Sequence, residues 1–226
     1  MDRNAAQSVC DAVAILTAAG VMDFNGHASL RRSEGGFLIN SGASDRAAMT
    51  PEQVCRVDGD GRPLDGIRPP NEVALHAAIY AARPDVQAVV HGHPKWSTLF
   101  TLTGKRIDVV MPQGCLVADL PVYPDPHSIS TAERGAAVAG ILGADRGALL
   151  AGHGSVLTGQ TLQEAVALAV YTEHNAERAY RARLLGSPRC IPAEDHDEYR
   201  QMLDKPGLYK KCWAFHLSQR RMADVR

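Results

Sequence analysis

Residues 69–94 read PPNEVALHAAIYAARPDVQAVVHGHP, and this stretch places a helix directly before a buried strand. Asn71 can cap the helix, an apolar and alanine-rich run continues it, and Pro84 ends it. The run DVQAVV then predicts a strand that leads into His91 and His93. A helix packed beside such a strand predicts a layered α/β architecture.

The two histidines stand at the end of this predicted strand. Residues two apart point to the same face of a strand, so His91 and His93 present two imidazoles together. A second apolar run that ends in a histidine occurs in ALLAGHGSV. This histidine, His153, lies between Gly152 and Gly154, where another stretch of backbone can approach closely. Three imidazoles bind a divalent ion and leave a position for substrate. The HxH spacing alone fits two ordinary loop histidines equally well, so this ligand set is a hypothesis.

Acid or base chemistry needs a further group, and Glu72 stands at the start of the helix that leads into the histidines. It can act as a fourth ligand before substrate binds and as a proton carrier afterwards. The alternative is that Glu72 only complements the positive end of the helix. His76, four residues on, shares its face and is expected to pack or to support the site. His174 is expected on a solvated helix face, whereas His196 and His216 join no visible constellation.

The rest of the chain alternates helices and strands. In the first part of the chain we expect an opening helix over residues 4–20, a β-hairpin over 25–40, and a short helix with a second hairpin over 50–66. In the second part we expect a short strand over 121–124, a helix over 130–143 that begins near Thr131, and a buried strand over 146–159. A long helix over 161–185 follows the capping box Thr161–Glu164. The expected fold class is α/β, as a single three-layer α/β/α domain over residues 1–226. Its sheet should be mostly antiparallel or mixed, with 186–226 as a C-terminal extension.

Composition narrows the class of protein. A chain of 226 residues that is 45% hydrophobic can bury the core of one domain. A net charge of -1 argues against nucleic acid or an anionic membrane as partner. The sequence contains no apolar run of the roughly 20 residues that a membrane-spanning helix needs, and its N-terminus is unlike a signal peptide, so we expect a cytoplasmic protein. Its five cysteines are widely spaced, which favours reduced thiols.

The order of the motifs is more specific than any one of them. About residues 5–185 resemble the class II aldolase and adducin-head family, through GHASLR, FLINSGAS, MTPEQVCRVDGDG, PPNEVALHAAIYAARPDVQAVVHGHP, LPVYP and ALLAGHGSVLTGQTLQEA. The resemblance implies a homotetramer with active sites at subunit interfaces and one divalent metal ion per subunit. It also implies that His91, His93 and His153 bind the metal and that Glu72 is catalytic. Adducin-like heads lack the full ligand set, so the resemblance points to an enzyme.

Departures from the sugar-phosphate aldolases concern the phosphate. Those enzymes hold it with an asparagine in a GNxS turn, a Thr-Gly pair and a Ser-Ser pair. The matching positions here are His27, Ser41 with Gly42, and Pro70 with Asn71. Because a phosphate needs several converging donors, the lost serine hydroxyls argue against a phosphorylated sugar.

A second departure concerns the proton donor of the aldol reaction. The aldolases use a tyrosine lent by a neighbouring subunit, but this chain has no tyrosine between Tyr80 and Tyr123, and the matching position falls near Met111. The sequence motifs GHxS and PPNE resemble those of the decarboxylase branch of the family more than those of the sugar-phosphate aldolases. Members of that branch remove CO2 from hydroxylated aromatic or heteroaromatic dicarboxylates, or from oxo acids.

We therefore predict a divalent-metal-dependent lyase that breaks a carbon–carbon bond through a metal-stabilised enolate or carbanion, with decarboxylation favoured. The expected partner is a small carboxylate substrate, contacted by the side chains or backbone of His27, Ser41, Gly42 and Asn71. Arg46 is a further candidate, unless it forms a surface salt bridge.

The sequence is also compatible with two other functions. The chain can be an aldolase for a non-phosphorylated hydroxy-carbonyl compound, or a non-catalytic adducin-like assembly module. Zinc or manganese is the favoured metal, and cobalt or iron would also fit.

His127 is either an acid that approaches a neighbouring subunit's site or a loop cap. The C-terminal GLYKKCWAFHLSQRR, residues 207–221, either covers the site or a subunit interface, or is an ordinary terminal helix.

Overall fold

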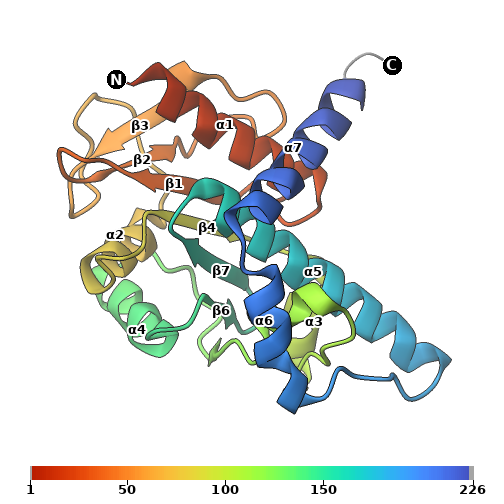
Figure 1. Cartoon of the computed structure of the whole chain (residues 1–226). Coiled ribbons are helices and arrows are strands. Elements are labelled where there is room, and N and C mark those ends of the chain that lie inside the picture. The colour runs from red at the N-terminus through yellow and green to blue at the C-terminus, as the bar shows by residue number, and fades with distance from the viewer. Residues whose placement is uncertain (1, 224–226) are drawn as a thin grey trace.

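The computed structural model describes residues 2–223, with side chains up to Gln219, and is organised around a seven-stranded sheet (Figure 1). The strand order is β3-β2-β1-β4-β7-β6-β5, and every neighbouring pair is antiparallel except β5 and β6. The strands are β1 (His27–Arg31), β2 (Phe37–Asn40), β3 (Val54–Val57), β4 (Ala88–Gly92), β5 (Val122–Tyr123), β6 (Gly147–Leu150) and β7 (Gly154–Gly159). The predicted mixed sheet is confirmed.

Helices cover both faces of this sheet and make the predicted α/β/α layers. The α-helices are α1 (Arg3–Ala18), α2 (Val73–Ala82), α3 (Lys95–Leu102), α4 (Ala132–Leu142), α5 (Leu162–Leu185), α6 (His196–Leu203) and α7 (Pro206–Ala223), and single 3₁₀ turns lie at Pro51–Gln53, Pro112–Val117 and Ala193–Asp195. Side chains alternate along β4, so Val90 packs in the cluster under α1 and α5 whereas Val89 packs in the cluster under α2 and α4. His91 therefore faces the α2 side.

Most predicted elements form close to their expected positions. α1, the β1–β2 hairpin, α4 and α5 occupy the predicted ranges, and Thr131 and Thr161 cap their helices through their side chains. None of the described helices is long and apolar enough to cross a membrane.

The start of α2 differs from the prediction. Glu72 occupies the N-cap position, and its side chain makes no capping hydrogen bond to the helix. The Val73 N–H instead donates to the Pro70 carbonyl at 3.1 Å, in a turn that precedes the helix. The expected Asn71 cap is therefore wrong, and the Glu72 carboxylate is free to turn toward the histidines.

The predicted strand 146–159 is in fact two strands, β6 and β7, joined by a turn. Gly152 has φ +64°, and the His153 N–H donates to the Leu150 carbonyl at 3.0 Å. A side chain at Gly154 would collide with the Gly92 carbonyl, so the end of β4 and the turn lie close together. The second hairpin was also overestimated, because β3 is followed only by an isolated bridge between Val57 and Pro63.

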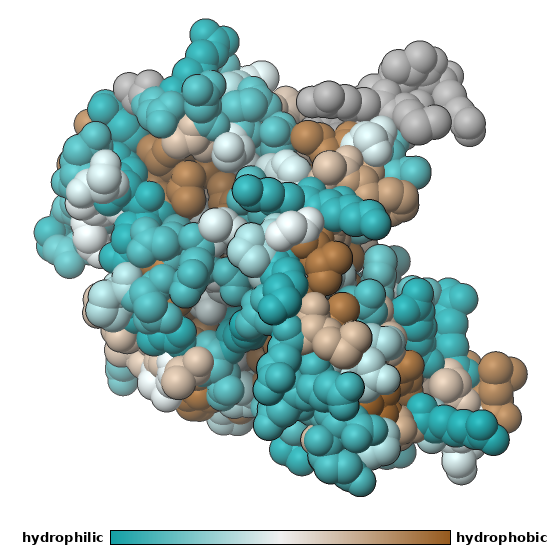
Figure 2. Space-filling view, viewed as in Figure 1, coloured by the Kyte–Doolittle hydropathy of each residue, from teal (hydrophilic) through white to brown (hydrophobic). Residues whose placement is uncertain are grey.

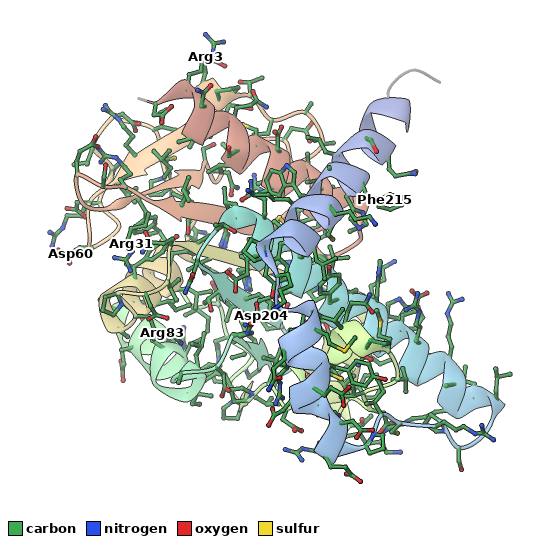
Figure 3. All side chains as sticks on the ribbon, in the orientation of Figure 1. Arg3, Arg31, Asp60, Arg83, Asp204 and Phe215 are labelled. Carbon is green, nitrogen blue, oxygen red and sulfur yellow. The ribbon has the colours of Figure 1, made fainter. Side chains whose placement is uncertain are left out.

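Of the C-terminal helices, α7 packs on α1 and α5, and α6 packs on the 3₁₀ segment Pro112–Val117; neither helix lies over the end of β4. Asp204, labelled in Figure 3, lies between α6 and α7, where its carboxylate contacts Arg146 and accepts from the Tyr209 hydroxyl at 2.7 Å. Tyr209 is buried, and Trp213 packs against the same core. Arg220 and Arg221 of the basic C-terminal segment have side chains outside the described part of the structure.

Glu173 of α5 holds the beginning of α3, the helix that follows His93. Its carboxylate accepts from the backbone N–H groups of Trp96 and Ser97 at 2.8 and 3.0 Å, and from the Ser97 hydroxyl at 2.9 Å. We expect Glu173→Ala to lower the free energy of unfolding by about 2–4 kcal/mol, because it leaves two N–H groups without an acceptor. Urea denaturation measures this change.

A control for this prediction lies one turn along α5. Glu177 pairs with Arg181 on the surface, and such exposed ion pairs contribute little. Glu177→Ala should change the unfolding free energy by no more than about 0.5 kcal/mol. Equal losses in the two variants would contradict the role given to Glu173.

Candidate metal centre

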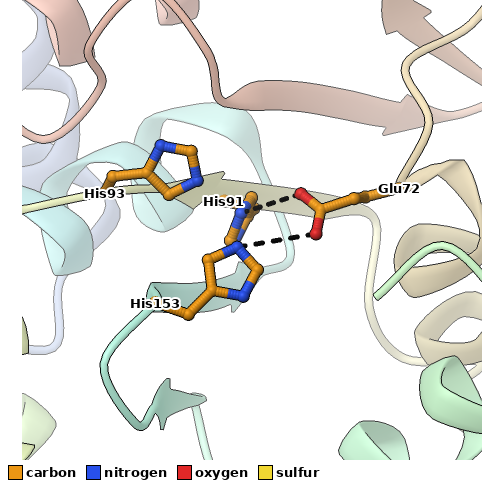
Figure 4. Close-up of side chains that lie close together, drawn as sticks. All are labelled: Glu72, His91, His93 and His153. Atoms are coloured by element: carbon orange, nitrogen blue, oxygen red, sulfur yellow. Dashed lines mark ion pairs between the residues drawn. The ribbon is translucent and has the colours of Figure 1, made fainter. Parts of the chain in front are cut away.

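Glu72 and three histidines converge where β4 ends and the β6–β7 turn begins (Figure 4). One ligand atom from each of Glu72, His91, His93 and His153 lies within 4.8 Å of the others. Glu72 Oε2 is 3.3 Å from His91 Nε2, and Oε1 is 3.5 Å from His153 Nε2. The structure thus brings together all four residues that the sequence proposed for the metal.

Two of these imidazoles are oriented by groups behind them. His91 Nδ1 lies 3.0 Å from the Ser155 carbonyl, which can only accept a hydrogen bond. His93 Nδ1 lies 3.1 Å from the Asp23 carboxylate. These acceptors hold the ring proton on Nδ1 and leave the Nε2 lone pair for a metal. Neither Asp23 nor Ser155 is near its histidine along the chain, so these partners could not be predicted from the sequence.

The donor set fits a divalent cation. His91 Nε2 is buried, and within the described residues it makes no hydrogen bond of good geometry, which is costly for a polar atom unless a ligand occupies the site. Burial lowers the pKa of His153 to about 4, so its imidazole is neutral as a metal ligand must be. The cluster is therefore able to hold a metal ion.

Glu72 is held at both carboxylate oxygens. Oε1 accepts from the Ile129 N–H at 2.7 Å and from the Ser128 hydroxyl at 2.9 Å, while Oε2 lies 3.3 Å from His27 Nε2. Burial raises the pKa of Glu72, but the hydrogen bond from His27 lowers it, and the pKa lies well below its usual range. The carboxylate is ionised and faces the cluster, which argues against a role confined to the helix end.

A cavity of about 560 Å³ opens onto this centre. Besides Glu72, His93 and His153, its lining includes His27, Gly42, Arg46, Arg68 and Asn71. Ser41 is not among the lining residues. Gly42 lines the cavity, and its N–H donates to the Arg68 carbonyl at 3.2 Å.

Arg46 is not the surface salt bridge that the sequence allowed. Its side chain is buried, with the residue only 4% exposed, and no described carboxylate lies within ion-pair distance. Nε donates to the Gly26 carbonyl at 2.8 Å, and Nη1 donates to Ser41 and Ser44 oxygens. Nη2 has no hydrogen-bond partner among the described residues. Arg46 is thus an anchored cation on the cavity wall.

The remaining histidines have local partners. His127 is exposed and caps its own loop, with both its backbone N–H and its ring against Asp125. His174 is half-buried beside His216 of α7 rather than solvated, because α7 covers that part of α5. His196 is buried and contacts the Ile191 carbonyl. None of the described α7 residues lines the cavity of its own chain, and a covering role for this segment, at a neighbouring subunit's site or at a subunit interface, stays a prediction.

Known proteins share this sequence pattern and fold. The family described as "Class II Aldolase and Adducin N-terminal domain" matches residues 7–180. The 3,4-dihydroxyphthalate decarboxylase of Terrabacter sp. is 34% identical, covering 84% of this chain and 86% of that protein. The 5-methylthioribulose-1-phosphate/5-deoxyribulose-1-phosphate aldolase of Rhodospirillum rubrum is 30% identical, covering 81% and 82%. An aldolase II superfamily protein from Pseudomonas syringae superposes with a TM-score of 0.85 at 18% identity, covering 98% and 94%, and so shares the fold.

Proposed function

The chain belongs to the class II aldolase and adducin N-terminal domain family, and from that premise we propose a divalent-metal-dependent carbon–carbon lyase that acts chiefly as a decarboxylase. Its substrate would be a hydroxylated aromatic or heteroaromatic carboxylate, or an oxo acid. The observation that carries the proposal is the convergence of Glu72 with three histidines on a cavity whose wall holds an unpaired arginine. A complete ligand set argues against a non-catalytic assembly module.

His91, His93 and His153 would hold the ion, with Glu72 beside it. A bound divalent ion supplies positive charge that stabilises the electron pair left when a carbon–carbon bond breaks. Glu72 moves the proton, because its ionised carboxylate can accept one from solvent and return it to the carbon that has lost CO2. Ser128, Ile129 and His27 keep that carboxylate in place throughout.

The cavity favours a substrate with a second carboxylate. Arg46 brings a buried positive charge with an unoccupied Nη2, and Arg68 and Asn71 line the same cavity. Arg46 Nη2 and the Arg68 guanidinium together suit a carboxylate, whereas a phosphate needs more converging donors. The 3,4-dihydroxyphthalate decarboxylase among the relatives has a name that fits such a substrate.

Arg68 offers a test of this substrate class. It is exposed, so Arg68→Gln should fold normally and raise KM for a dicarboxylate by about 3- to 10-fold with kcat unchanged, since it removes a partly solvated charge. Arg62→Gln is the control, because Arg62 is exposed, pairs with Asp60 and does not line the cavity. An equal rise in KM for an analogue without the second carboxylate would contradict the assignment.

The reaction class is tested by metal analysis followed by CO2 detection. Purified protein would be assayed with hydroxylated aromatic dicarboxylates and with oxo acids, before and after chelation. We expect CO2 release that stops when the metal is chelated and returns when metal is added. An aldehyde product would identify the alternative aldolase activity, and a protein that binds no metal would support the assembly module.

Zinc or manganese is the metal that we propose, with cobalt or iron also compatible with three imidazoles and substrate oxygens. We also propose a cytoplasmic location, which the wide spacing of the five cysteines supports.

A homotetramer with active sites at subunit interfaces is a further part of the proposal. Phe24 is 83% exposed and stands between Asp23, which contacts His93, and Asn25, which lines the cavity. Brown patches near α7 and at the end of α5 also interrupt the hydrophilic surface in Figure 2, and Phe215 projects from α7 in Figure 3. Large exposed apolar side chains of this kind mark interaction surfaces. Light scattering would test the assembly, and an active monomer would overturn it.

A further inference from the structure

Behind Glu72, four buried side chains form a continuous hydrogen-bonded chain between β1 and α2. His27 Nε2 is 3.3 Å from Glu72 Oε2, and His27 Nδ1 is 2.7 Å from His76 Nε2. His76 Nδ1 is 2.6 Å from Ser29 Oγ, which is 2.7 Å from the Tyr80 hydroxyl. His76 and Ser29 are fully buried, and His27 and Tyr80 are no more than 6% exposed. We name this set the buried relay.

The two secondary structures explain why these side chains meet. His27 and Ser29 are two apart on β1 and so point to the same face of the sheet. Glu72, His76 and Tyr80 follow one another at four-residue spacing and lie on one face of α2. The side chains from β1 pack between those from α2. This set of side chains ends at the metal centre, because His27 pairs with the metal-site residue His91 in the register of β1 against β4.

The hydrogen atoms of the buried relay can be placed by elimination. The ionised Glu72 carboxylate can only accept, so His27 Nε2 must donate to it. The single proton of the buried, neutral His27 ring is then on Nε2, so its Nδ1 accepts from His76 Nε2. Burial lowers the pKa of His76 well below its usual value, so His76 Nδ1 accepts from the Ser29 hydroxyl. The Tyr80 hydroxyl then donates to Ser29, and every group is satisfied.

We propose that His76, fixed by Ser29 and Tyr80, is a positioning residue that locks His27 in its Nε2–H tautomer and so directs a permanent donor at Glu72 Oε2. With Oε1 already held by the Ile129 N–H, this second donor fixes the plane of the carboxylate. Glu72 would then present the same lone pairs to the metal and substrate in every turnover. The metal ligands His91 and His93 carry the opposite tautomer, with the proton on Nδ1.

The buried relay positions a proton donor and does not supply protons. Burial raises the pKa of Tyr80 well above its usual value, although its contact with Ser29 and the nearby Arg31 oppose the rise. A shift of every hydrogen toward Glu72 would leave a buried phenolate, which is unfavourable. The tautomer claim stands without the proposed reaction, and only its kinetic consequence rests on that reaction.

The tautomers can be read directly from the full chain loaded with zinc. Long-range proton–nitrogen NMR spectra of ¹⁵N-histidine protein, assigned with single His→Gln variants, distinguish Nε2–H from Nδ1–H rings. We expect His27 and His76 as neutral Nε2–H tautomers, and His91 and His93 with the proton on Nδ1. An Nδ1–H tautomer at His27 would overturn the proposal, whatever reaction the enzyme catalyses. A protein that fails to take up zinc would count against the proposed function, and the His27 and His76 tautomers would still be read from the metal-free chain.

Kinetics test the consequence for Glu72. His76→Leu removes the donor to His27 and should lower kcat by about 10- to 100-fold, with KM and bound zinc unchanged. His76→Gln keeps an N–H near the Nε2 position and should recover most of the loss. Ser29→Ala and Tyr80→Phe, which cut the chain farther from Glu72 and fold more readily, should give progressively smaller losses in kcat.

Phe37 supplies the matched packing control. Its ring stacks on His76 and contacts Tyr80 in the same buried cluster, but it has no polar atom. Phe37→Leu therefore perturbs the packing and leaves the hydrogen bonds. Losses of kcat as large as those of His76→Leu would show that only packing matters and would refute the positioning role.

Discussion

Glu72→Gln is expected to keep its bound metal and to lose turnover by about 100- to 10,000-fold. Glutamine retains the shape of the side chain, and its amide oxygen can still accept from Ile129 and Ser128. It cannot accept and return a proton at neutral pH, so the carbanion left after bond cleavage has no proton carrier. Three histidines remain to hold the ion. Metal analysis and kcat, measured on the same preparation, check both halves of the prediction.

The substitution also affects the buried relay. With the amide oxygen against the Ile129 N–H, the amide N–H₂ would face His27 Nε2, which at present donates in that direction. Two donors cannot pair, so His27 and His76 should both change to the Nδ1–H tautomer in this variant, with His76 then donating to Ser29. Glu133→Gln is the control, because Glu133 lies exposed in the first turn of α4. If Glu72→Gln kept turnover within a few-fold of the parent, Glu72 could not be the proton carrier.

The clustering of Glu72 with the three histidines could be predicted because the information for it is local. His91 and His93 end an apolar strand, the two-residue period puts them on one face, and His153 ends a second apolar run between glycines. Glu72 precedes the same strand by one helix. In each case the side chain's direction follows from the period of its own element, and the order of the motifs pointed to the family.

The supports of the site could not be predicted, because they depend on pairing across the chain. Asp23 reaches His93 from a loop 70 residues earlier, and the Ser155 carbonyl reaches His91 only through the register of β4 against β7. His76 was expected to pack or to support the site, and its partners follow from the contact of α2 with β1. Arg46 was misjudged for the same reason, since its burial depends on loops that fold over it.

The structural preferences of single residue types also led to two wrong element boundaries, at the start of α2 and between β6 and β7. Asn71 is a favourable helix cap by type, but the turn that follows two prolines places Glu72 in that position instead. The run from Gly147 to Gly159 is apolar enough for one strand, and the left-handed glycine at 152 divides it into two. Both errors concern where an element begins or ends. Such boundaries are set by tertiary contacts as much as by residue type.

The other large effect is expected for His153→Ala, which should abolish both metal binding and activity. His153 lies in the β6–β7 turn, outside both strands, so alanine leaves the strand pairing of β6 and β7 intact. Two imidazoles and one carboxylate then remain, and the histidines cannot close a three-nitrogen site. We expect the metal affinity to fall by more than about 100-fold, because loss of a ligand should exceed the 10- to 100-fold effect of losing a supporting partner. Metal analysis after gel filtration measures the loss.

Two further variants separate a ligand from a bystander. His127→Ala removes an exposed histidine that caps its own loop through Asp125, and it should leave the metal content unchanged. Asp23→Asn removes only the charge behind His93, so it should weaken metal binding by about 10- to 100-fold without abolishing it. The expected order of metal affinity is therefore the parent and His127→Ala first, Asp23→Asn next and His153→Ala last. Full metal occupancy in His153→Ala would remove this residue from the ligand set, and the cluster would then have to bind through Glu72 and the two strand-end histidines.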